Sequence, residues 1–135
     1  MLHDAFVSTS RVRAFVRDVL RCGCPESVFD DVRIGLPGLY GTHRVAGGLE
    51  ILVGRRLLVA IAPFEDVGDP DSDIPKMLDE GRRVRDANAF NRYRLVLVGS
   101  FDAARRARLE GLTAALDDRI HIHLVDESEL EATIE

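Results

Sequence analysis

The only two thiols of this 135-residue chain belong to Cys22 and Cys24, which Gly23 separates. Thiolates act as nucleophiles and as metal ligands, and a position at a helix N-terminus lowers the pKa of a thiol. Because Pro25 and Glu26 are typical of a first helical turn, we expect Cys24 at such a terminus. Cys22 and Cys24 are therefore candidate catalytic residues for thiol redox chemistry. Free cysteines also serve as small buried packing residues, and the sequence leaves that interpretation open.

A second pair of side chains with metal-binding chemistry is His121 and His123, which alternate with aliphatic residues over 119–125. Residues two apart on a strand share one face, so both imidazoles point the same way. With Cys22 and Cys24 they would complete the two-sulfur, two-nitrogen set of a tetrahedral zinc site. Nothing in the sequence brings the two pairs together, and a partly solvated strand face is the simpler interpretation of the histidines.

Polar residues also follow the predicted strands at their carboxyl ends, where open α/β sheets bind ligands. Ser100 and Asp102 are the candidate cofactor-binding residues there. They would hold a hard cation such as Mg²⁺ as part of an acidic rim, or Ser100 would receive an anion at a helix N-terminus. The other members of this rim are Glu65, Asp66, Asp126 and Glu127. Serine and aspartate also cap helices without any ligand, which is the simpler interpretation.

The elements that would position these residues alternate between helices and strands. Apolar residues spaced three and four apart predict long helices over 11–21, from 72 or 73 to about 88, and from 101, capped by Ser100, to about 116. Short helices are expected from 24 and from 128. Strands are expected at 32–34, 50–53, 56–62, 93–98 and 119–125. Gly54 at the first central position of the hairpin favours a type II′ turn.

This order predicts a single α/β domain over residues 1–135, with 1–9 loosely ordered. We expect a mixed sheet of about five strands, antiparallel in its N-terminal part, with a parallel β-α-β-α-β part and helices on both faces. The aliphatic runs at 57–62 and 95–98 predict central strands that are covered on both sides. Gly81 lies on the inner face of the second long helix and predicts close approach to the sheet.

The order α-β-β-β-α-β is similar to that of restriction-endonuclease-like folds. Their metal site needs an acidic residue and a lysine two apart on one strand. The strand 57–62 has neither, so this resemblance implies a shared order of elements and no nuclease activity.

Composition limits the classes of partner and compartment. A formal charge of −5 argues against nucleic acid, which needs a concentrated positive surface. No apolar run approaches the roughly 18 residues that span a bilayer, and the first residues lack the features of a signal peptide. We therefore expect a cytoplasmic protein with no membrane partner.

The sequence contains no readable nucleophile–base pair, so we expect a non-enzymatic adaptor or regulatory protein with a protein partner. The glycine-rich segment 35–48 and the outer faces of two helices would make the contacts. Those faces carry Arg82, Arg83 and Arg85, and Arg105, Arg106 and Arg108. The same arginines would also pair with neighbouring acidic residues. The alternative function is thiol redox or metal handling through Cys22-Gly23-Cys24. A homodimer through the His121/His123 edge strand is a further expectation.

Overall fold

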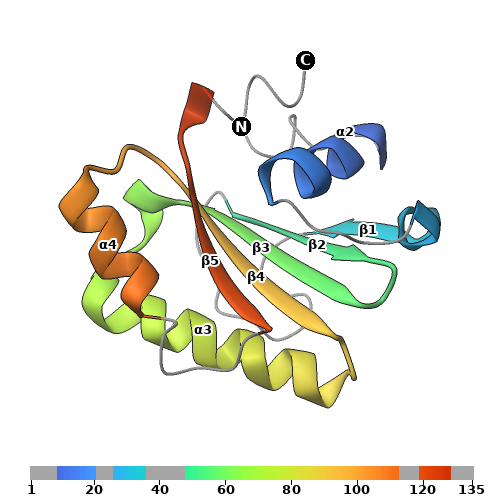
Figure 1. Cartoon of the computed structure of the whole chain (residues 1–135). Coiled ribbons are helices and arrows are strands. Elements are labelled where there is room, and N and C mark those ends of the chain that lie inside the picture. The colour runs from blue at the N-terminus through green and yellow to red at the C-terminus, as the bar shows by residue number, and fades with distance from the viewer. Residues whose placement is uncertain (1–8, 21–25, 36–47, 113–118, 129–135) are drawn as a thin grey trace.

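The computed structural model describes residues 9–20, 26–35, 48–112 and 119–128. Its centre is one five-stranded sheet with helices on either side (Figure 1). The strands are β1 (Val32–Gly35), β2 (Leu49–Val53), β3 (Leu57–Pro63), β4 (Arg92–Val98) and β5 (Ile120–Val125). The helical elements are α2 (Thr9–Ala14), η1 (Phe15–Val19), η2 (Glu26–Asp30), η3 (Phe64–Asp66), α3 (Pro70–Ala87) and α4 (Ala103–Gly111).

The strands lie side by side in the order in which they occur along the chain. β1, β2 and β3 form an antiparallel meander, and β4 and β5 add to β3 in parallel. The connections that contain α3 and α4 make the parallel pairing possible, because a parallel strand needs a long crossover. The predicted mixed sheet, with its antiparallel N-terminal part and parallel C-terminal part, is confirmed.

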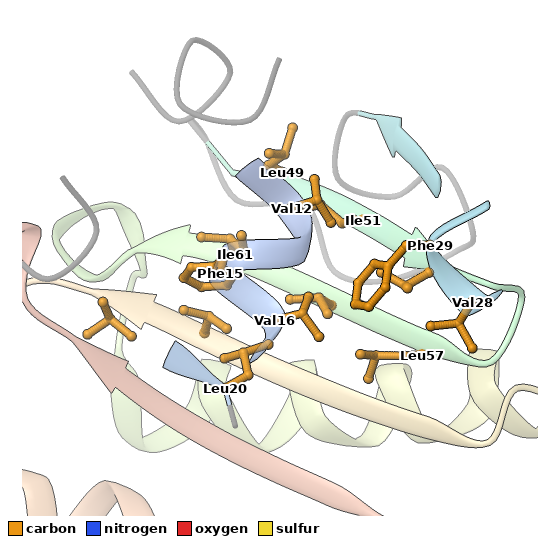
Figure 2. Packing of buried hydrophobic residues seen from close by; sticks show 14 of the residues in the cluster. Val12, Phe15, Val16, Leu20, Val28, Phe29, Leu49, Ile51, Leu57 and Ile61 are labelled. Carbon is orange, nitrogen blue, oxygen red and sulfur yellow. The ribbon is translucent and has the colours of Figure 1, made fainter. Parts of the chain in front are cut away.

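Side chains of alternate residues give the sheet two different apolar faces. The face that packs on α2 and η1, which we call the α2 face, includes Ile51, Val59, Ile61, Val96, Val98 and Val125. Figure 2 shows Val12, Phe15, Val16 and Leu20 reaching down from the helix onto this face. The opposite α3 face includes Leu58, Ala60, Leu95, Leu97 and Leu124, which pack with residues of α3 and α4. Helices on both faces, and central strands covered on both sides, are as predicted.

The N-terminal helix differs from the predicted uniform α-helix. It changes from α-helical to π-helical geometry at Phe15, and the Leu20 amide donates to the Phe15 carbonyl at 3.1 Å. The bond spans five residues, as π-helical turns require. Of the apolar positions that predict this helix, Val12, Phe15, Val16 and Leu20 are at most 2% exposed, and Val19 is partly buried against them.

Two helix starts and one turn are corrected by the structure. α3 begins at Pro70 rather than 72 or 73, because the Asp69 carboxylate accepts from the Asp71 amide and caps it. The N-cap of α4 is Asp102, not Ser100. In the β2–β3 hairpin both Gly54 and Arg55 have positive φ, the pattern of a type I′ turn rather than type II′.

The spacing of apolar residues predicts an inner face of α3 that ends at Ala87 or Asn88, and the structure buries its first five positions: Ile74, Met77, Leu78, Gly81 and Val84. Ala87 and Asn88 are exposed. Gly81 lies against the ring of Tyr93, and a side chain at position 81 would overlap that ring. The expectation that Arg85 lies outside this face is wrong, because Arg85 is only 3% exposed and its guanidinium contacts Asp86 at 2.9 Å. In the ranges that the structure describes, none of the helices has the length and apolar character needed to cross a bilayer.

Candidate functional site: a basic cluster on the α2 face

Cys22 and Cys24 lie outside the described residues, as do most of the glycine-rich segment and the end of the chain beyond 128. The thiol redox hypothesis and the cysteine half of the proposed zinc site therefore stay predictions. His121 and His123 are described, and both lie on the edge strand β5 as expected. Their half-buried side chains share the α2 face, two residues apart.

Ser100 and Asp102 follow β4, but they do not form a visible ligand site. Ser100 is exposed, and the Asp102 carboxylate accepts from the Arg105 amide at 2.7 Å as the cap of α4. An anion at this helix terminus would be repelled by that carboxylate. Within the described ranges, no three His, Cys, Asp or Glu side chains gather to hold a metal ion. The cofactor role of Ser100 and Asp102 therefore stays a prediction, and helix capping accounts for Asp102.

The arginines on the outer faces of α3 and α4 are matched by groups of the same chain. Asp79 contacts Arg82 at 2.7 Å and Arg83 at 2.6 Å, both along α3. Arg108 contacts Asp71, while Arg105 and Arg106 stack over the rings of Phe64 and Phe101. These contacts agree with the simpler of the two interpretations, in which the arginines pair locally.

A different group of basic residues lies where β4 and β5 run side by side. We call Arg92, Arg94, His121 and His123 the basic cluster. On β4, Arg92 and Arg94 alternate with core residues and share the α2 face with Val96 and Val98. On β5, the two histidines share that face with Val125. Register places Arg94 directly beside His121 and Val96 beside His123. The two pairs are therefore offset along the strands, with Arg92 at the start of β4 and His123 farthest from it.

Arg94 is the buried member of the basic cluster. It is 7% exposed, and its Nη1 lies 2.8 Å from Nε2 of His123. A guanidinium has only donors, so Nε2 of His123 accepts and carries no proton in this contact. The Nε of Arg94 has no hydrogen-bond partner in the part of the chain that the structure describes. This buried guanidinium thus has one neutral acceptor, His123, and one donor, Nε–H, without a partner among the described residues.

The pKa values in the basic cluster are lowered by burial and by neighbouring positive charges. Burial, together with the smaller effects of the charges of Arg94 and His121, lowers the pKa of His123 to about 4. The pKa of Arg94 is lowered by burial and then by the charge of Arg92. Among the described residues, every charge that shifts these two pKa values is basic. The cluster becomes accessible at the exposed Arg92 and the half-buried His121.

This arrangement is suited to binding anions rather than to nucleophilic chemistry. Arginine presents donors to oxyanions, and the lone pair of His123 is engaged by Arg94. The sequence reasoning identified the two histidines but missed Arg92 and Arg94. The available signal was an arginine at position 94, inside the predicted strand 93–98 and on the same alternation as Val96 and Val98.

Comparison of the chain with protein-family models, with curated proteins and with solved structures found no significant match.

Proposed function

We propose that the protein is a non-enzymatic adaptor or regulatory protein that binds an anionic group of a partner protein at the basic cluster. The observation that carries the proposal is the buried guanidinium of Arg94, which among the described residues contacts a neutral histidine and not a carboxylate. A buried charge is expensive unless it is paired, and an anion from outside the described residues would pair it.

The contrast with the other arginines supports this assignment. Arg82, Arg83 and Arg108 contact carboxylates, and they are exposed, where such pairs contribute little to stability. Arg94 is buried, where a paired charge matters most, and among the described residues the charge that acts on it is that of Arg92. Local electrostatic complementarity, and not the net charge of −5, therefore selects the partner.

Titration calorimetry with an oligoglutamate peptide tests this function. Arg92→Glu reverses a charge at the exposed end of the cluster, and Arg83→Glu makes the same charge change on α3. We expect the wild type to bind, and Arg92→Glu to bind about tenfold more weakly, a loss of about 1.4 kcal/mol. Arg83→Glu should bind like the wild type. Equal weakening by both variants, or no binding to the wild type at low salt, would contradict the proposal.

A further inference from the structure

We infer that the basic cluster takes a dianionic tetrahedral oxyanion, the phosphoryl group of a phosphorylated residue on the partner protein. This inference rests on the proposed function and specifies its ligand. Arg92, Arg94 and His121 would donate to the phosphoryl oxygens, with His123 holding Arg94 in place through the contact at 2.8 Å.

The first argument is the match of charge. Arg92 and Arg94 lie two residues apart on one face of β4, close enough for the charge of Arg92 to lower the pKa of Arg94. Two guanidinium charges so placed repel each other, and one carboxylate neutralises only one of them. A phosphoryl group carries a charge of about −1.5 to −2 at neutral pH and neutralises both.

The second argument is the arrangement of donors. Neighbouring strands lie about 4.8 Å apart, and residues two apart on a strand are separated by about 6.6 Å. Arg94 and His121 face each other across that shorter distance, since they are register partners. The donors therefore come from two strands, with His121 on β5 and with Arg92 and Arg94 at two successive positions of the same face of β4. A phosphoryl group offers three acceptor oxygens in different directions, whereas a carboxylate offers two in one plane.

The third argument is the unused donor capacity of Arg94. Its Nη1 is engaged with His123, and its Nε–H has no hydrogen-bond partner in the described ranges. The side chain is more than nine-tenths buried and is held among side chains of the α2 face. A bound oxyanion would satisfy this donor, because arginine can present Nε–H and Nη–H together as a fork to two oxygens.

The test follows the arginine Nε–H signals by nitrogen–proton NMR during titration with inorganic phosphate, sulfate and acetate. We expect phosphate and sulfate to shift one buried Nε–H signal. They should also bind at least about tenfold more tightly than acetate, because a dianion makes charge-assisted hydrogen bonds to two arginines and acetate to one. Arg94→Gln should remove that signal. Arg92→Gln, at an exposed position that leaves the core intact, should weaken phosphate binding about tenfold, and Arg83→Gln should not change it.

A second titration, with a phosphoserine peptide and the same peptide carrying glutamate, identifies the source of the phosphoryl group. Tighter binding of the phosphoserine peptide supports a phosphorylated partner. Binding of inorganic phosphate without the phosphoserine peptide would overturn the assignment to a protein. Equal binding of phosphate and acetate would overturn the inference, and the oligoglutamate titration would still decide the proposed function by itself.

Discussion

The Arg94 guanidinium donates from Nη1 to Nε2 of His123 across the β4–β5 pair, at 2.8 Å. The contact holds a charged side chain against an imidazole that has to remain neutral. It lies on the α2 face, at the end of the sheet where Arg92 and His121 complete the basic cluster. The pH dependence of folding should report on this contact directly.

Stability should fall as the pH is lowered from 6.5 toward 4. The pKa of His123 is about 4 in the folded protein against an ordinary value of 6.5, because of burial and of the charges of Arg94 and His121. The unfolded chain therefore binds more protons in this range, so the stabilising contribution is complete above pH 6.5 and declines below it. The loss has an upper bound of about 3 kcal/mol, at 1.4 kcal/mol for each pKa unit. Urea unfolding of the wild type and His123→Gln at several pH values measures it. Parallel curves for the two proteins would contradict the assignment.

Gly81→Ala should destabilise the protein by about 1–3 kcal/mol, the range for overpacking a core. The added methyl group would overlap the ring of Tyr93 on β4. Gly111→Ala is the matched control, since no atom of the described residues lies within 4 Å of a methyl group there and alanine favours the helix. Thermal unfolding should separate the two variants in opposite directions. Partial recovery in Gly81→Ala combined with Tyr93→Leu would identify the ring as the cause.

Ala89→Gly should stabilise the protein by about 1 kcal/mol, because alanine has a positive φ of 58° at the end of α3. The Phe90 amide donates to the Arg85 carbonyl at 2.8 Å, which is the long bond of a Schellman motif. Ala87→Gly, inside the same helix, should destabilise by a similar amount. Urea midpoints that fall for both glycine variants would show that the left-handed backbone at 89 carries no strain.

Arg106 covers part of the outer edge of β5. The Tyr93 amide donates to the Arg119 carbonyl, and the Gly99 amide donates to the Val125 carbonyl. The backbone N–H and C=O groups of odd-numbered residues in β5 therefore point toward β4, and those of even-numbered residues point away from the sheet. The outward carbonyl of Leu124 accepts from Nη1 of Arg106 at 3.3 Å. Edge strands that are covered in this way resist pairing with another chain.

Arg106→Ala should therefore increase self-association through the β5 edge, the surface for which a homodimer is expected from the sequence. Arg105→Ala is its control, because it removes the same charge and a similar ring contact without touching β5. Light scattering coupled to size exclusion over a concentration series measures the difference. The same oligomeric state for both variants would rule out a protective role for Arg106.

The thiol hypothesis predicts that Cys22 and Cys24 are both alkylated by iodoacetamide in the native protein near neutral pH. At least one thiol should have a pKa well below about 8, as expected beside a helix N-terminus. Metal analysis of untagged protein tests the zinc variant. Resistance of both native thiols to alkylation would leave buried packing as their role.

The elements of this fold were largely readable because each depends on local periodicity. Local periodicity is clear in the aliphatic runs of β3 and β4 and in the inner face of α3. The structure confirms these two strands and this helix. The starts of α3 and α4 were misplaced because Ser and Asp compete for the same caps. Only the hydrogen bonds in the structure show that the carboxylates of Asp69 and Asp102 are the N-caps and that Ser100 is not the cap of α4. The burial of Arg85 also depends on how α3 is rotated against the sheet.

The sequence by itself determined that residues 95–98 form a central strand and that His121 and His123 share one face, because aliphatic runs and two-residue alternation act locally. It did not determine that Arg94 is buried beside His123. That contact joins two residues that are 29 positions apart in the sequence. It exists only because β5 pairs in parallel with β4 in the register that places Arg94 opposite His121. A shift of one residue would move both histidines to the α3 face and separate them from Arg94. Tertiary structure therefore created the basic cluster, from residues whose individual patterns indicate only strands.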